Sequence, residues 1–166
     1  MPLRSAALLL SRLAECGRPF AEEAARRLGA HDATDFGPVP LSCRSSAYRR
    51  PSDDPVLPPE RNKVLAVCGF ALSLLDGSEQ QRLFSRLCTE AGHTFFFDFK
   101  TPERNLEWPS VLLFAPLRHA VSCCVLEKQG GMEGILYQER KRFSVLSRHT
   151  LLGGAFCGIL VRNASL

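Results

Sequence analysis

The chain has 166 residues, 45% of them hydrophobic, and a formal net charge of +4. This length suits one domain with an apolar core. So mild a positive excess does not predict a nucleic-acid-binding protein, in which basic residues gather on one face. No apolar run is long enough to span a membrane, so we expect a protein that binds neither nucleic acid nor membrane.

The cysteines indicate a reducing compartment. There are seven of them, and no two form a C-x-x-C pair. The four histidines do not lie at metal-ligand spacing relative to them, so no metal site is predicted. An odd number of cysteines, several inside apolar runs, is typical of reduced thiols used as small hydrophobic residues. We therefore expect a cytoplasmic protein.

Residues 1–29 predict a helical segment. Residues 5–15 place apolar side chains on one helical face, and Gly17 is the expected end of that helix. Pro19 suits the first turn of a second helix, which ends before Gly29.

Residues 30–62 predict an irregular linker. Six prolines and a serine-rich stretch interrupt them, and no hydrophobic period is visible. Irregular connections of this length are uncommon inside compact domains. The region is therefore expected to be a linker, a mobile lid, or sequence outside the fold.

Residues 63–166 predict an α/β domain. A short continuous apolar run at 64–68 is typical of a strand buried on both faces. A helix follows, with Ser78 as its N-cap and Gln81 completing a capping box. A second buried strand covers 94–97. Strand, helix and strand predict a parallel pair with a right-handed crossover.

The rest of this domain predicts an interrupted helix and a closing hairpin. The helix covers 110–127, with a break at Pro116. One or two further helical turns at 132–138 follow a glycine break. Residues 142–151 and 155–162 are rich in β-formers and flank Gly153-Gly154, a pair that can take positive φ at both positions, as a primed hairpin turn requires.

Two segments follow the predicted parallel strands, where ligands bind in open α/β sheets. After the first strand comes Cys68-Gly69-Phe70. After the second comes a group of polar side chains: Asp98, Lys100, Glu103, Arg104 and Asn105. A carboxylate there could hold a hydroxyl or a cation, and Arg104 could pair with a substrate carboxylate or phosphate. The alternatives are that Glu103 and Arg104 pair with each other and that Asn105 caps the next helix.

Other candidate sites have simpler structural explanations. His149 could act as a base, but a structural histidine is the favoured interpretation. The glycine-rich run 130–134 resembles a phosphate-binding loop without its Lys-Ser/Thr, so it predicts a helix break. Cys123-Cys124 predicts helix packing and no nucleophile, because no His/Asp pair stands at recognisable spacing beside it. No G-x-S-x-G motif is present, which disfavours a serine hydrolase of the nucleophile-elbow type.

Taken together, these elements resemble the C-terminal half of class I S-adenosylmethionine-dependent methyltransferases. The resemblance covers residues 63–166. It rests on the element order and on D-F-K at 98–100, P-E-R-N-L-E at 102–107, G-G-M-E-G at 130–134 and the closing glycine-pair hairpin. These motifs look like those of a bacterial group of such enzymes. The resemblance implies a partial Rossmann-like sheet of parallel strands with an antiparallel C-terminal hairpin.

The resemblance also implies a cofactor, S-adenosylmethionine, and a small-molecule methyl acceptor of unknown identity. Cys68, Gly69 and Phe70 would border the methionine end of the cofactor. The polar group from Asp98 to Asn105 would face the acceptor. Methyl transfer is an in-line displacement that depends on proximity and orientation, so no catalytic residue and no metal are predicted.

The chain departs from this family in residues 1–62. The family's G-x-G-x-G cofactor loop and its ribose-binding acidic residue do not appear there. Three interpretations follow. The chain is a truncated product of a methyltransferase gene, a non-catalytic binding or regulatory module that pairs through an exposed sheet edge with itself or another chain, or an unrelated small enzyme that uses the polar group. We expect weak or undetectable S-adenosylmethionine binding.

Overall fold

A five-stranded mixed β-sheet forms the centre of the fold. The computed structural model describes residues 3–30, 32–35, 63–103, 105–120 and 128–164. The strands are β1 (Asp32–Asp35), β2 (Val64–Gly69), β3 (His93–Phe99), β4 (Phe143–Leu151) and β5 (Phe156–Asn163), in the order β1-β2-β3-β5-β4. The first three run parallel, whereas β5 is antiparallel to both β3 and β4.

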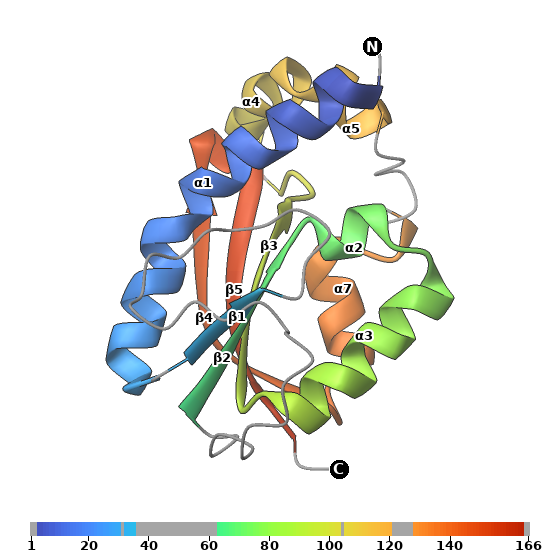
Figure 1. Cartoon of the computed structure of the whole chain (residues 1–166). Helices are drawn as coiled ribbons and strands as arrows, with labels where there is room; N and C mark the ends of the chain where they lie inside the picture. The colour runs from blue at the N-terminus through green and yellow to red at the C-terminus, as the bar shows by residue number, and fades with distance from the viewer. Residues whose placement is uncertain (1–2, 31, 36–62, 104, 121–127, 165–166) are drawn as a thin grey trace.

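Helices pack on both faces of this sheet (Figure 1). One face carries α1 (Leu3–Leu28), and the other carries α2 (Ala71–Leu74), α3 (Gly77–Glu90) and α7 (Gly131–Gln138). Beyond the carboxyl end of β3 lie η2 (Asn105–Glu107), α4 (Trp108–Leu113) and α5 (Ala115–Ala120). The α/β class predicted from the sequence is therefore confirmed.

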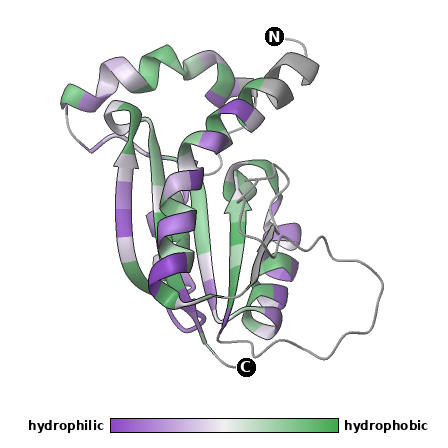
Figure 2. Ribbon diagram, turned by 60° about the vertical axis from the view of Figure 1, so that its left-hand side comes forward, coloured by the Kyte–Doolittle hydropathy of each residue, from purple (hydrophilic) through white to green (hydrophobic). Residues whose placement is uncertain are grey.

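The inner strands are buried on both faces, as their apolar runs predict. Every residue of β2 is buried, and so is every residue of β3 after His93. The two strands are parallel neighbours, with Val67 opposite Phe95, and α2 and α3 connect them. The outer strand β4 is mostly exposed, and polar and apolar residues are mixed along it (Figure 2). The predicted parallel pair is confirmed.

The N-terminal segment is one helix, so the prediction of two helices is wrong. α1 continues through Gly17 and Pro19, and Pro19 is exposed. Leu10, Ala14 and Ala21 on one face of α1 are buried in the same core as the sheet. The proline removes one backbone hydrogen bond. Packing of a continuous apolar face outweighs that loss, because tertiary contacts supply most of the stability of a helix.

A short strand lies within the region predicted to be irregular. Asp32–Asp35 pairs in parallel with Val64–Val67. The edge of β2 that was expected to be exposed is therefore covered over these four residues, and that expectation is wrong. The rest of the expected linker, 36–62, lies outside the described residues.

The helix after β2 begins with a different cap from the one predicted. Asp76 is the N-cap of α3, and its Oδ1 accepts hydrogen bonds from the backbone N–H of Ser78 and Glu79, both at 2.8 Å. The backbone N–H of Asp76 donates to Glu79 Oε2 at 3.1 Å. The capping box is therefore present two residues earlier than the Ser78–Gln81 box, because the carboxylate of Asp76 competes successfully for the same donors.

The C-terminal hairpin is confirmed, but its turn is longer than predicted. β4 and β5 pair up to Leu151 and Phe156, so four residues connect them. Gly153 and Gly154 both have positive φ, at 63° and 97°, as predicted. Leu152 is also left-handed, with φ of 49°, so the connection is a short 3₁₀ turn, η3 (Leu152–Gly154), and the two-residue turn is wrong.

The predicted 110–127 helix is interrupted near Pro116, as expected. α4 and α5 are separated at Phe114, and Pro116 lies in the first turn of α5. Proline has no N–H to donate to the carbonyl four residues earlier, which favours a break at this point. Residues 121–127, which include Cys123-Cys124, lie outside the described residues.

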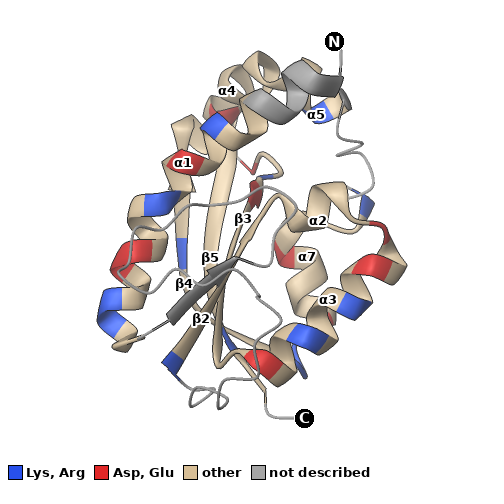
Figure 3. Cartoon of the chain, viewed as in Figure 1, with Lys and Arg blue, Asp and Glu red and all other residues tan. Residues whose placement is uncertain are grey.

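Charged residues of both signs are interspersed along α1 and α3 (Figure 3). Some form pairs one helical turn apart, such as Arg27 with Glu23 at 2.6 Å and Arg86 with Glu90 at 3.2 Å. These pairs are solvent-exposed, so water screens them and they contribute little to stability. They lie on the outer faces of the helices and do not indicate a functional site.

Candidate functional site

A small chamber opens at the carboxyl end of β3. It has a volume of about 180 Å³ and lies where the segment after β3 meets the start of α7. We call it the polar chamber; its lining residues are Phe99, Lys100, Thr101, Glu103, Gly130, Gly131, Met132, Glu133 and Cys157. Two segments far apart in the sequence, 99–103 and 130–133, therefore meet in one place.

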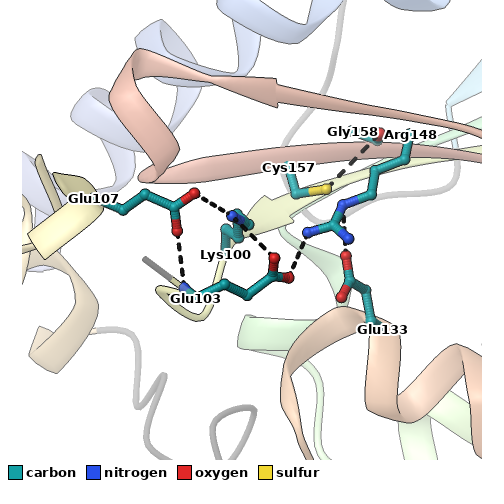
Figure 4. Close-up of polar contacts among 7 residues, drawn as sticks. All are labelled: Lys100, Glu103, Glu107, Glu133, Arg148, Cys157 and Gly158. Atoms are coloured by element: carbon teal, nitrogen blue, oxygen red, sulfur yellow. Dashed lines mark hydrogen bonds and ion pairs between the residues drawn. The ribbon is translucent and has the colours of Figure 1, made fainter. Parts of the chain in front are cut away.

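Five charged side chains form a connected network around this chamber (Figure 4). Lys100 Nζ lies 2.6 Å from Glu107 Oε1 and 3.9 Å from Glu103 Oε2. Arg148 contacts Glu103 Oε1 at 2.6 Å and Glu133 Oε1 at 2.7 Å. The second oxygen of Glu107 accepts the backbone N–H of Glu103 at 2.8 Å. Three carboxylates thus share two cations.

A β-bulge places Arg148 in this network. The β4–β5 register shifts between Val145 and Ser147, so that Val145 lies opposite Val161 and Arg148 lies opposite Ile159. Side chains alternate between the faces of a sheet, and the extra residue reverses the alternation. Arg148 therefore lies on the same face as Val145, next to α7, instead of on the α1 face.

Lys100 is held firmly at the floor of the chamber. Its side chain is only 5% exposed. Its backbone N–H donates to the Ala155 carbonyl at 3.0 Å, and its own carbonyl accepts from Arg118 Nη1 at 3.0 Å. The guanidinium of Arg118 in turn lies 5.3 Å from the centre of the Phe99 ring. The network is therefore built on a backbone segment fixed from both sides.

The pKa values of two carboxyl groups of the chamber, Glu103 and Glu133, are shifted in opposite directions. The hydrogen bond from Arg148 lowers the pKa of Glu103. Burial raises the pKa of Glu133, although Arg148 opposes the rise. Carboxyl groups whose pKa values are pushed apart are typical of acid–base sites. Burial also raises the pKa of Cys157 to about 11, so its thiol is neutral near pH 7 and is not an activated nucleophile.

Two buried oxygens on the chamber wall have no hydrogen-bond partner. They are Thr101 Oγ1 and Glu133 Oε1, and no other described side chain has such an atom. Glu133 Oε1 is near Arg148 Nε but lacks hydrogen-bond geometry. Gly131 keeps the space beside the Thr101 hydroxyl, because a Cβ at Gly131 would lie 2.6 Å from that oxygen. Buried polar atoms are rarely left unpaired, so these two indicate a place for a ligand or water.

The structure places Asp98 away from the chamber. It is 1% exposed and lies under α2, where its carboxylate accepts the backbone N–H groups of Leu72 and Ser73, both at 3.0 Å, and the Ser73 hydroxyl. Burial raises its pKa to about 6, although these hydrogen bonds oppose the rise. Asp98 therefore holds α2 onto β3, and its predicted role in binding a substrate has no open surface to support it.

The other predicted acceptor residues divide between the chamber and its surroundings. Lys100 and Glu103 line it. Glu103 pairs with Arg148 and Lys100, while Arg104 lies outside the described residues. Asn105 is exposed at the start of η2 and does not line the chamber.

The residues predicted to border the cofactor are buried. Cys68 and Phe70 are 0% exposed, and Gly69 is buried as well. Phe70 has φ of 53°, and its backbone N–H donates to the Phe97 carbonyl at 2.7 Å. Its ring packs against Phe97, with the ring centres 5.5 Å apart. These three residues offer no surface to S-adenosylmethionine, so they do not fit the cofactor.

Some residues of the network were not singled out from the sequence. Glu107 and Glu133 lie inside the motifs that carry the family resemblance, so a signal for them exists. Arg148 has no local signal, because the bulge decides its face. The neighbouring His149 lies on the opposite face, with its ring 5.0 Å from that of Phe20. Gly130 and Gly131, with φ of 81° and 72°, form the predicted break before α7.

No protein-family model matches the chain, and no curated protein matches it either. Within the described residues, no group of three or more His, Cys, Asp or Glu is placed to hold a metal ion. None of the described helices is long and apolar enough to cross a membrane. The sheet and the polar chamber are therefore the features of the molecule that bear on its function.

Proposed function

We propose that this protein is an α/β protein of the class I methyltransferase type whose polar chamber binds a small-molecule methyl acceptor. One observation carries the proposal. Two parallel strands, β2 and β3, followed by the antiparallel hairpin β4–β5, fit the partial sheet that the family resemblance implies, and the chamber opens at the carboxyl end of β3. Ligands of open α/β sheets bind at such edges.

The chamber has the parts needed to hold and orient a polar acceptor. Thr101 Oγ1 has no hydrogen-bond partner, and Glu133 Oε1 has only its ion pair with Arg148, so both can accept a hydrogen bond from a hydroxyl or amino group of the ligand. Arg148 keeps Glu103 ionised by lowering its pKa. Glu133, whose pKa burial raises, is the better group to take a proton from a bound hydroxyl or amine. Orientation in a confined site supplies most of the advantage in methyl transfer.

The described residues supply the acceptor side of this chemistry and no cofactor site. Cys68, Gly69 and Phe70 are buried against the aromatic core. S-adenosylmethionine therefore remains a cofactor implied by resemblance alone, and weak or undetectable binding stays our expectation. The proposal concerns the ligand in the chamber.

Removal of the Glu133 carboxylate tests the proposal. A library of small hydroxyl- and amine-bearing compounds is screened against the full chain by ligand-observed NMR, and the hits are repeated with Glu133→Gln and Glu90→Gln. We expect Glu133→Gln to weaken the hits about tenfold, roughly the free energy of one hydrogen bond to a charged group. Glu90→Gln is the matched control, because Glu90 is exposed on α3, away from the chamber.

The opposite result would overturn the proposal. If no compound loses affinity in Glu133→Gln relative to Glu90→Gln, the chamber is not the binding site. Circular dichroism of both variants shows whether the fold is retained. The alternative of a non-catalytic module that pairs through a sheet edge remains a hypothesis, and β1 already covers part of the edge that it invoked.

A further inference from the structure

We propose that the polar chamber and an apolar groove beside it form one site for an amphipathic small molecule, with a hydroxyl or amino head group in the chamber and an aromatic tail in the groove. This inference rests on the proposed function, because it names the chemical class of the acceptor. Three features of the described residues carry it: the groove itself, its shared wall with the chamber, and the two oxygens without a hydrogen bond at the head-group end.

The groove lies between α7 and the edge strand β4. Its volume is about 430 Å³, and it is lined by Glu133, Leu136, Tyr137, Arg140, Phe143, Ser144, Val145, Arg148 and Ile159. We call it the apolar groove, since five of these side chains are aliphatic or aromatic. Tyr137 is 69% exposed and Val145 is 57% exposed. Large apolar side chains left open around a concavity are typical of a ligand-binding surface.

The groove and the chamber share a wall. Glu133 lines both, and Arg148 lines the groove while contacting two carboxylates of the chamber. Figure 4 shows Arg148 reaching from β4 between Glu103 and Glu133. The Arg148 and Glu133 side chains are 37% and 41% exposed, so solvent screens this contact and little free energy resists a shift of the two side chains. A ligand can therefore pass from one hollow to the other.

The head-group end requires a hydrogen-bond donor. The Glu133 oxygen without a hydrogen bond is an acceptor, and the Thr101 hydroxyl can also accept. The cations of the chamber are already engaged, since Glu107 holds Lys100 at 2.6 Å and Glu103 holds Arg148 at 2.6 Å. A ligand carboxylate or phosphate would meet the carboxylates of Glu103 and Glu133, while both cations of the network already hold carboxylates. A hydroxyl or ammonium group finds acceptors in these two carboxylates and in the Thr101 hydroxyl.

The tail end favours an aromatic ring. The Arg140 guanidinium lies 5.0 Å from the centre of the Tyr137 ring at the rim of the groove. A flat ring could stack on Tyr137 or under Arg140, whereas a branched chain could do neither. The chamber, at about 180 Å³, has room for only a small polar group. A small polar chamber next to an apolar groove fits a small molecule better than a peptide, because the main chain of a peptide would not enter the chamber.

A matched series of probes tests both ends of the site. Binding to the full chain is measured by ligand-observed NMR for phenethyl alcohol, phenethylamine, phenylacetate and ethylamine. We expect the alcohol and the amine to bind at least tenfold more tightly than phenylacetate, because the carboxylates of the chamber repel the negative charge of phenylacetate. We also expect phenethylamine to bind at least tenfold more tightly than ethylamine, which lacks the ring.

Substitutions in the apolar groove test whether the aromatic tail of the ligand binds there. Val145→Asp should weaken binding of the neutral phenethyl alcohol at least fivefold, because it puts a charge into the apolar groove. Leu106→Asp is the matched control, since Leu106 is 89% exposed and lines neither hollow; it should change binding less than twofold. If Val145→Asp does not fold, judged by circular dichroism, Tyr137→Ser on the exposed face of α7 replaces it with the same expected loss.

Each outcome decides between the two proposals. Equal affinities for phenethylamine and ethylamine, or no loss in the groove variants, would overturn the two-part site and leave the chamber as proposed. Tightest binding by phenylacetate would overturn the head-group assignment. No binding by any probe, while library hits still lose affinity in Glu133→Gln, would exclude aromatic tails and leave the proposed function intact.

Discussion

Two aspartates accept hydrogen bonds from the first turns of neighbouring helices, one of them buried and the other exposed. Asp98 reaches from β3 to the first turn of α2 and is fully buried. Asp76 caps α3 at the surface. Burial raises the pKa of Asp98 from 3.8 to about 6, whereas the hydrogen bonds from Glu79 and Ser78 lower the pKa of Asp76. The same side chain therefore responds to pH in opposite directions.

The raised pKa of Asp98 predicts a specific pH dependence of stability. The folded state holds this proton more tightly than the unfolded state, so the contribution of Asp98 is full below pH 3.8 and is lost as the pH rises to about 6. Urea unfolding of the wild type and of Asp98→Asn should show a free-energy difference that shrinks by at most about 3 kcal/mol between pH 4 and pH 7. A constant difference would mean that Asp98 is not perturbed.

Asp76→Asn is the matched control, for which the pH dependence of the stability difference has the opposite sign. The lowered pKa of Asp76 means that its contribution is present above its ordinary pKa of 3.8 and is lost as the pH falls. The stability difference between the wild type and Asp76→Asn should therefore grow with rising pH. Taking differences between proteins cancels the titration of all other groups.

At the residue scale, the sequence predicts which side chains are polar near the sheet edge but not where they face. Lys100 and Glu103 line the chamber as expected. Asp98 does not, because the chain after β2 turns back over it through α2 and buries it. Whether a polar residue at a strand end is open or covered depends on a segment 25 residues earlier, as the Ser73–Asp98 bond shows.

The long helix α1 is the clearest difference at the scale of elements. Local rules place a stop at Gly17 and a start at Pro19, and both residues are inside the helix. The apolar face that packs against the sheet is continuous through them. Tertiary packing therefore overrides the local signals, as it commonly does for helix propensity.

Pro19→Ala tests whether α1 is one helix. Alanine restores the missing N–H and removes the ring from an exposed helix interior, so we expect a gain of about 1–3 kcal/mol in the free energy of unfolding by urea. Pro109→Ala is the control, because Pro109 occupies the first turn of α4, where proline is favourable, and its replacement should not stabilise. Destabilisation by Pro19→Ala would indicate a helix start at Pro19 instead.

The bulge in β4 is the element-scale feature that the site depends on most. It moves Arg148 to the face of α7 and His149 to the face of α1. The β-rich run is visible in the sequence, but the position of an extra residue is not, because it depends on the register with β5. A histidine and an arginine next to each other in sequence thus end on opposite faces of the sheet.

At the scale of the whole molecule, the described residues form an open chamber that could bind an acceptor, but no open site for the cofactor. The proposed methyltransferase type rests on the parallel strands β2 and β3 and the antiparallel C-terminal hairpin, and the residues expected to border the cofactor are sealed. We expect calorimetric titration of the full chain with S-adenosylmethionine to give weak or undetectable heat. Micromolar binding would contradict this expectation and would reveal a cofactor site that the three sealed residues do not form.

The sequence by itself determined the class of the fold: two apolar runs became buried parallel strands, and a glycine pair became the end of the hairpin. These features are encoded locally, because a strand buried on both faces has to be apolar along its length. Only the tertiary structure decided that Lys100, Glu133 and Arg148 meet in one chamber and that Cys68, Gly69 and Phe70 are closed. Both outcomes depend on the register and packing of segments distant in the chain, which no local pattern specifies.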